Sequence, residues 1–208
     1  MSSKLSWHVA THTLAQQAGK ALHYIYKIQY KCGKLSTTAA FELFDKMIVP
    51  ILLYGSEVWG FKNYDSIEIV QRKFCRKILG VGSKTCNEVV IGECGRLPLC
   101  ILYMQICIKY WLKILEMPRQ RYPHACYKML KHLDENGKIT WATNVKNLLC
   151  SIGFGHAWIN QGVGNKFLFL SEFRQRLVDC EIQKWHDVLT SKPKLRTYCS
   201  YKDSLVQE

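Results

Sequence analysis

Four basic residues at close spacing are the first candidates for a chemical role in this sequence. Arg72, Lys73, Arg76 and Lys77 stand at i, i+1, i+4 and i+5, so on a helix they share one flank. Cations grouped in this way can contact one phosphate backbone together, and such contacts position a nucleic acid without reading its bases. The plainer alternative is a solvated helix surface, which is the usual fate of a charge run.

A second basic series lies near the N-terminus and consists of Lys20, Lys27, Lys31 and Lys34. Tyr24 and Tyr30 lie among these lysines. Their rings could stack on a base or ribose, although aromatic residues on a helix more often pack in a core. If the two series engage roughly four to eight phosphates, affinity should fall by orders of magnitude between low and moderate salt.

The overall charge supports a polyanionic partner. The chain has 29 Lys and Arg against 16 Asp and Glu, a formal net charge of +13. A surface of this sign releases counterions from RNA or DNA when it binds. At 208 residues and 48% hydrophobic composition, the chain can bury one good core or two small ones, which excludes a disordered class.

The motifs of catalysis and of metal binding are missing from the sequence. It has no G-x-S-x-G, no H-E-x-x-H and no glycine-rich dinucleotide motif, and its seven histidines are scattered. Ten cysteines occur without a C-x-x-C pair. The nearest approach to a metal signature is Cys-x5-His, at Cys150 with His156 and at Cys180 with His186; half-buried thiols are the alternative. We therefore expect no catalytic residue, no metal site and no cofactor in this chain.

The cysteines and the N-terminal sequence indicate in which cellular compartment the protein is expected. We find no signal-peptide pattern, so we expect reduced thiols in the cytosol or nucleus and not a secreted protein. The segment from Leu99 to Leu115 is apolar enough to be compared with a membrane span. Gln105, Lys109 and Lys113 follow one helical stripe through it, which favours a core helix with one solvated edge and no membrane partner.

Hydrophobic periodicity predicts a mainly α fold. We expect helices at 7–31, 38–54, 65–80, 97–116, 123–136, 141–152 and 166–190. Pro50 should kink or shorten the second helix, and Asp65 with Glu68 resembles a capping box at the start of the third. Asn87 to Glu93 could form a short strand or a helical turn. A break near Met117 suggests two parts, 1–116 and 117–208.

Longer runs of residues carry a family resemblance. They are FELFDKMIVPILLYGSEVWG at 41–60, VQRKFCRKILGVG at 70–82 and GRLPL at 95–99. These runs resemble the region just downstream of the palm in reverse transcriptases of non-LTR (LINE-type) retrotransposons. The resemblance continues more weakly through WATNVKNLL, HAWINQ and RLVDCEIQKWHDVL.

The resemblance implies that 1–116 is a thumb-like helical domain and 117–208 a post-thumb region. Members of the family copy RNA into DNA with magnesium held by paired palm aspartates, and no adjacent aspartates occur here. The chain is thus expected to be a non-catalytic fragment, from a truncated or decayed reading frame. Its expected partners are the phosphates of RNA, DNA or an RNA-DNA hybrid duplex, and the missing fingers and palm.

The same resemblance assigns architectural roles to the YGSEVWG run. Gly55 would permit a turn, Trp59 would bury its ring against the basic helix, and Glu57 would cap a helix or form a salt bridge. Three rival readings stay open. The chain could be a free-standing basic module that binds nucleic acid, a part that completes an active site with a separate palm, or a protein-interaction module that uses the helix at 99–115.

Overall fold

The structure is a computed structural model that describes residues 7–33, 35–202 and 204–205. These residues form helices and turns and contain no strand, which confirms the mainly α prediction. The helices are α1 (His8–Cys32), α2 (Thr37–Leu43), the π-helical turn η1 (Phe44–Ile48), α3 (Val49–Leu52), α4 (Ser56–Trp59), α5 (Asp65–Leu79), α6 (Asn87–Glu93), α7 (Cys100–Leu115), α8 (Tyr122–Glu135), α9 (Trp141–Ser151), α10 (Gly155–Ile159), α11 (Lys166–Ser191), the 3-10 turn η2 (Pro193–Leu195) and α12 (Arg196–Cys199).

The chain forms two compact units that interleave along the sequence. Unit 1 contains the described residues up to Tyr54, Tyr64–Leu99, and those from Ile182 onward. Unit 2 contains Gly55–Asn63 and Cys100–Glu181. Residue 116, where the sequence suggests a boundary, lies inside unit 2, and the division into thumb and post-thumb regions stays a prediction.

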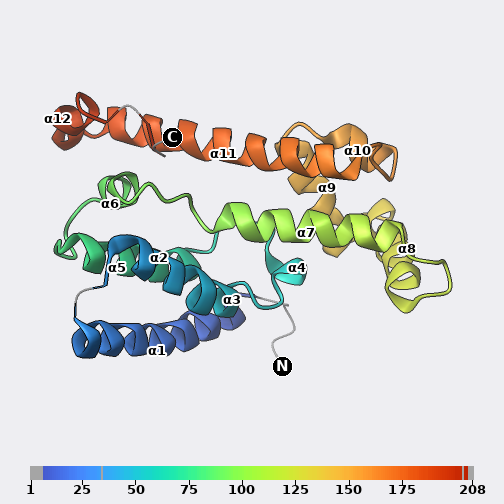
Figure 1. Ribbon diagram of the computed structural model, residues 1–208. Coiled ribbons are helices and arrows are strands. Elements are labelled where there is room, and N and C mark those ends of the chain that lie inside the picture. The colour runs from blue at the N-terminus through green and yellow to red at the C-terminus, as the bar shows by residue number, and fades with distance from the viewer. Residues whose placement is uncertain (1–6, 34, 203, 206–208) are drawn as a thin grey trace. The chain divides into compact units, whose positions relative to one another are not determined.

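In unit 1, α1 packs against α5 and α3, and the α2–η1 segment lies over α5 (Figure 1). Aromatic rings join these helices. The ring of Phe74 on α5 stacks on Phe44 with 4.6 Å between centroids and meets Phe41 edge-on at 5.5 Å. Phe44, Phe74 and Ile25 of α1 are fully buried. This apolar centre fixes which sides of α1 and α5 face solvent.

Pro50 interrupts its helix as predicted. The chain from Thr37 to Leu52 is helical throughout, but the turn before Pro50 is π-helical, with the amide of Val49 donating to the carbonyl of Phe44. Proline has no amide hydrogen, and its ring would clash with the carbonyl four residues earlier. A wider turn accommodates both effects without ending the helix.

The C-terminal segment completes unit 1. Trp185, Leu189, Leu195 and Leu205 form a buried cluster with residues of α6 and its flanks. The indole of Trp185 donates to the carbonyl of Glu88 at 2.9 Å and lies over Gly92. A Cβ at position 92 would come within 2.9 Å of Trp185 Cζ2, so only glycine lets the indole approach this closely.

In unit 2, α7 is the central helix, and α4 packs against it. Eight of its residues are buried, so the apolar segment is a core helix, while Lys109 and Lys113 lie at its exposed edge as predicted. This burial leaves little of the helix free for the protein-interaction role. No helix in the described part of the chain has both the length and the apolar character needed to cross a bilayer.

The predicted helix bounds agree with the structure to within a few residues, and several details differ. Asn87–Glu93 is helical, so the strand alternative is wrong. The capping box at Asp65 is also wrong: Tyr64 is the N-cap, and buried Glu68 accepts the amide of Leu99 at 3.1 Å. The short helices α10 and α12 were not predicted.

Candidate nucleic-acid interface

The basic residues of α5 lie on the side of the helix that faces away from the core. Ile67, Val70 and Phe74 are buried, whereas Lys73 and Lys77 are exposed and the two arginines half-buried. The helix ends where predicted, because Gly80 takes the left-handed conformation at φ 69° and its amide caps the last turn. The sequence pattern therefore placed all four cations on the correct flank.

The two arginines of this flank are engaged inside the protein. Arg72 forms an ion pair with Asp65, two helical turns earlier. Arg76 donates to the carbonyl of Thr85 at 3.0 Å and to the side chain of Asn87, so it ties the loop before α6 to the end of α5. These contacts reduce the number of α5 cations that are free to meet a ligand from four to two.

The two lysines of α5 remain available. Lys73 extends into solvent from the middle of the helix. The ammonium of Lys77 lies 5.9 Å from the ring centroid of Tyr26 on α1, so this lysine reaches toward the neighbouring helix. A cation over an aromatic face is weakly attracted to it at an exposed site, and this contact leaves the charge accessible to an anion.

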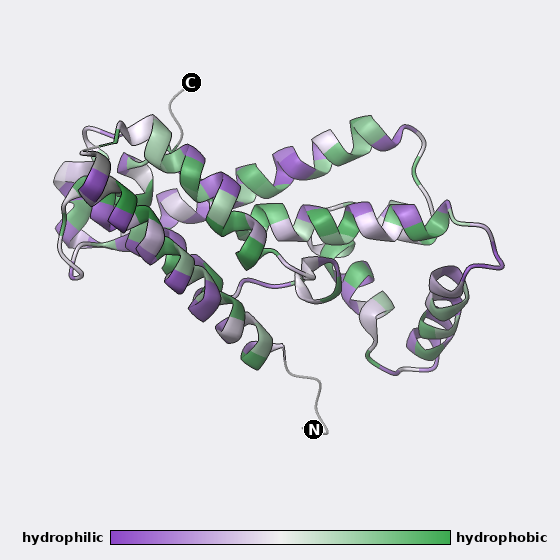
Figure 2. Ribbon diagram, turned by 60° about the horizontal axis from the view of Figure 1, so that its bottom comes forward, coloured by the Kyte–Doolittle hydropathy of each residue, from purple (hydrophilic) through white to green (hydrophobic). Residues whose placement is uncertain are grey.

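The lysines of α1 form a row on solvent. Lys20, Lys27 and Lys31 are exposed and occupy the side of α1 opposite the buried Ala18, Leu22 and Ile25. Figure 2 shows hydrophilic and hydrophobic residues alternating along this helix. Lys34, the fourth predicted member, falls outside the described residues. The structure thus brings the other lysines of this second series onto one helix face, as the sequence indicates.

The tyrosines of this row do not pack in the core. Tyr24 is 64% exposed and Tyr30 is 92% exposed. The ammonium of Lys27 lies 5.5 Å from the Tyr24 ring centroid. The core interpretation weighed from the sequence is therefore wrong for both rings, since they lie beside the lysines and not beneath them.

Tyr26 connects the two basic helices. Burial between them raises the pKa of its hydroxyl to about 12, with a smaller contribution from nearby Cys75. Beneath α5 the thiols of Cys75 and Cys94 share a hydrogen bond, which raises the pKa of Cys75 and lowers that of Cys94. Burial adds to the first shift, and the Arg96 charge adds to the second.

A second ion pair holds the base of this interface. Arg96 forms a two-pronged contact with Asp45 of η1, one arm measuring 2.9 Å, and its guanidinium lies 5.2 Å from the Phe41 ring centroid. Gln71 of α5 donates to the carbonyl of Leu97 at 2.9 Å. These contacts fasten the 95–99 segment to α5 and to the α2–η1 segment.

The YGSEVWG run begins at Tyr54 in unit 1 and continues in unit 2 from Gly55 onward. Gly55 adopts φ 65°, which permits the predicted turn, and Glu57 lies in the first turn of α4. Trp59 is buried with its ring 5.4 Å from Tyr103 of α7. The predicted contact of this indole with the basic helix stays a prediction, and its neighbour Tyr103 on α7 lies more than forty positions away in the sequence.

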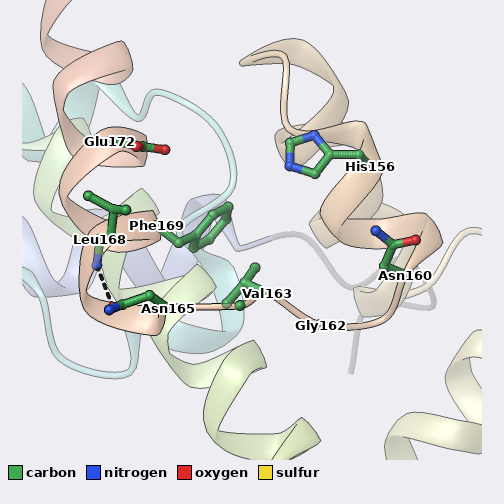
Figure 3. A pocket seen from close by; sticks show the side chains of 9 residues that line it. His156, Asn160, Gly162, Val163, Asn165, Leu168, Phe169 and Glu172 are labelled. Atoms are coloured by element: carbon green, nitrogen blue, oxygen red, sulfur yellow. Dashed lines mark hydrogen bonds between the residues drawn. The ribbon is translucent and has the colours of Figure 1, made fainter.

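Unit 2 carries a hollow that the sequence did not predict. It lies between α10 and the first turn of α11, with His156 and Glu172 on opposite sides (Figure 3). Asn165 accepts the amide of Leu168 at 3.0 Å and so occupies one of the free donors at the start of α11. Among the described residues, no cluster of three or more His, Cys, Asp or Glu could hold a metal ion, here or at the Cys-x5-His pairs.

Comparisons with family models, with curated proteins and with solved structures gave no match to this chain. The function must therefore be argued from the basic surface of unit 1 and from the resemblance of its sequence.

Proposed function

We propose that this chain is a thumb and post-thumb fragment of a non-LTR retrotransposon RNA-directed DNA polymerase, which holds a nucleic-acid backbone and performs no catalysis of its own. The observation that supports the proposal is the row of exposed lysines on α1, next to the free lysines of α5. All of them belong to unit 1, so one compact body presents the charges.

The dimensions of the row suit a nucleic-acid strand. Lys20 and Lys31 are eleven residues apart, which on a helix is roughly 16 Å at a rise of 1.5 Å per residue. Phosphates of one strand follow one another at about 3.4 Å along a duplex axis. The α1 row can therefore span about five phosphates, and Lys73 and Lys77 add contacts from the neighbouring helix.

The chemistry of the row favours backbone contacts over base recognition. Lysine is a compact point charge on a flexible stem, and it lacks the planar fork with which arginine reads guanine. The arginines on the α5 flank are held by Asp65 and by the loop before α6. We infer binding without sequence preference, as expected of a part that follows a duplex of changing sequence.

Electrophoretic retardation over a series of salt concentrations tests this proposal. The full chain should bind RNA-DNA hybrid and duplex DNA more tightly than single strands of equal length and mixed sequence. Five engaged lysines predict a slope of log K against log salt of about −4 to −5. Binding that is independent of salt, or absent for every nucleic acid at low salt, would contradict the proposal.

A primer-extension assay tests the second half of the proposal. Because the chain carries no adjacent aspartates, it should not extend a primer on an RNA template with magnesium and deoxynucleotides. An intact reverse transcriptase in the same buffer is the positive control. Extension by the purified chain alone would overturn the non-catalytic assignment.

A further inference from the structure

Two exposed aromatic rings flank the lysine row of α1. A single exposed tyrosine on a protein surface is ordinary and needs no explanation. Tyr24 and Tyr30, however, lie on the same helix face as Lys20, Lys27 and Lys31, and both rings are mostly in solvent. Phosphate-binding groups and stacking groups thus share one surface, which backbone binding alone does not require.

Helix geometry places the rings on the two sides of the row. With about 100° between successive residues, Tyr24 and Tyr30 project roughly 60° to either side of Lys27. They are separated by roughly 9 Å along the helix axis. A strand whose phosphates follow the lysines would therefore have an aromatic face within reach on each side.

A shallow depression adjoins the first ring. It is lined by Gln16, Gly19, Lys20, His23, Tyr24 and Lys27. Gly19 forms an open floor, since a Cβ there would find no atom within 4 Å. The amide of Gln16 and the imidazole of His23 can donate and accept hydrogen bonds at a base edge.

These groups together fit a nucleotide better than a protein partner. A protein docking on apolar surface would need a continuous apolar patch, whereas exposed Lys27 lies between the two rings, and Lys20 and His23 border the first ring. Every nucleobase has a flat face that stacks on an aromatic ring, and every nucleotide has a phosphate for a neighbouring lysine. The duplex itself hides its base faces, so the rings can only serve bases that are unpaired.

We propose that the outer face of α1 binds unpaired nucleotides beside a duplex, with bases stacked on Tyr24 and Tyr30 and phosphates held by Lys20, Lys27 and Lys31. This inference rests on the proposed function, because it extends the same surface from the duplex to its single-stranded end. Lys27 already lies beside the Tyr24 ring, so it can meet the phosphate of a nucleotide whose base stacks there.

The test compares two hybrids that differ in one feature. The first is a blunt RNA-DNA hybrid, and the second is the same hybrid with a short unpaired thymidine extension. Wild-type protein should bind the extended hybrid about tenfold more tightly or better. The double substitution Tyr24→Leu with Tyr30→Leu should abolish this difference and leave affinity for the blunt hybrid within about twofold, because leucine keeps the helix but cannot stack.

A spectroscopic readout separates stacking from a change in folding. With 2-aminopurine in the extension, wild-type protein should change the probe's fluorescence, and Tyr24→Leu with Tyr30→Leu should not. The variant Tyr24→Phe with Tyr30→Phe keeps both rings and should behave as wild type. Tyr201→Leu is the matched control, because Tyr201 is 83% exposed, lies in unit 1 and is not on α1.

The outcomes distinguish this inference from the proposed function. If wild-type protein binds the blunt hybrid with the expected salt dependence but gains nothing from the extension, the inference alone is wrong. If Tyr24→Leu with Tyr30→Leu still binds the extended hybrid more tightly than the blunt one, the inference is also wrong and the proposed duplex binding stands. If wild-type protein binds neither hybrid, both proposals fall together.

Discussion

The two basic helices of unit 1 display cations in different ways. On α1 the described lysines of the row lie in solvent, with aromatic rings between them. On α5 the flank of four cations is divided: Arg72 and Arg76 bind groups of the protein, whereas Lys73 and Lys77 have no acidic partner among the residues that the structure describes. An equal number of basic residues on two helices therefore does not give two equal binding surfaces. The arginines, with several donors in a rigid fork, brace the fold, and the lysines face the solvent.

Reversing the charge of the α1 row should have the largest effect. The variant with Lys20→Glu, Lys27→Glu and Lys31→Glu should bind hybrid duplex at least about a hundredfold more weakly at low salt. The slope of log K against log salt should also become about three units shallower, because three phosphate contacts are replaced by repulsion.

On α5, the variant with Lys73→Glu and Lys77→Glu should bind hybrid duplex about tenfold more weakly, since two phosphate contacts are lost. Fluorescence anisotropy over a salt series measures both.

A control for charge alone is available in unit 2. The control variant carries the same lysine-to-glutamate change at Lys109, Lys128 and Lys138. These lysines are exposed and lie outside the proposed interface. If this variant loses as much affinity as the α1 variant, binding follows net charge and the α1 row has no special role.

Removing the Arg76 side chain should cost stability more than binding. Arg76→Gln loses the charged hydrogen bonds to the Thr85 carbonyl and to Asn87, which should lower the free energy of unfolding by about 1–3 kcal/mol. The matched control Lys77→Gln, one residue away on the same flank, should change it by less than about 0.5 kcal/mol. Urea denaturation followed by circular dichroism measures the two. Equal decreases in the free energy of unfolding would mean that Arg76 stabilises the fold no more than Lys77 does.

Tyr26, between the two helices, predicts a pH dependence. Its folded-state pKa is about 12 and its ordinary value is 10.0, so the unfolded chain ionises first as pH rises. The contribution of Tyr26 is complete below about pH 10 and is lost as pH rises through about 12. Tyr26→Phe should therefore lose less stability than wild type between about pH 9 and about pH 11. Urea midpoints at the two pH values, with Tyr201→Phe as control, check this.

The smallest effect is expected at the ion pair of Arg72. Its partner Asp65 is 73% exposed, and pairs of this kind contribute about 0–1 kcal/mol. Arg72→Gln should thus change the free energy of unfolding by less than about 1 kcal/mol, and the small difference should disappear in high salt. A loss as large as that of Arg76→Gln would show that the two arginines brace the fold alike.

The sequence predicted the elements of this interface well and the contacts between them poorly. Helix ends at Gly80, Gly137 and Gly153 follow from local chemistry, because glycine accepts the positive φ found at each. The flank of α5 also follows from spacing alone. The engagement of Arg76 does not, since its partners lie in a loop whose path is set by packing elsewhere. Of the missed contacts, only Asp65 with Arg72 left a signal, the seven-residue spacing of opposite charges on one helix.

The sequence also predicted the burial of the α1 tyrosines wrongly, because it favoured a core position for side chains that are exposed. Average burial favoured a core position for Tyr24 and Tyr30, but Leu22 and Ile25 already fill the inner side of the helix. Counting the apolar stripe first would have assigned both rings to the outer side. Helical spacing also places Ile28 and Met47 on inward stripes, but they are 39% and 42% exposed because each lies at the margin of its stripe.

The way in which Trp185 lies over Gly92 bears on how the protein is made. The segment from Ile182 onward closes the same unit that holds α1. A ribosome releases the N-terminal helix long before it has translated that segment, and the intervening unit 2 emerges in between. The helix α6 therefore stays incompletely packed until the segment from Ile182 onward has also left the exit tunnel. A nascent polypeptide stalled before Trp185 would leave Gly92 and the rest of this face of α6 open to solvent.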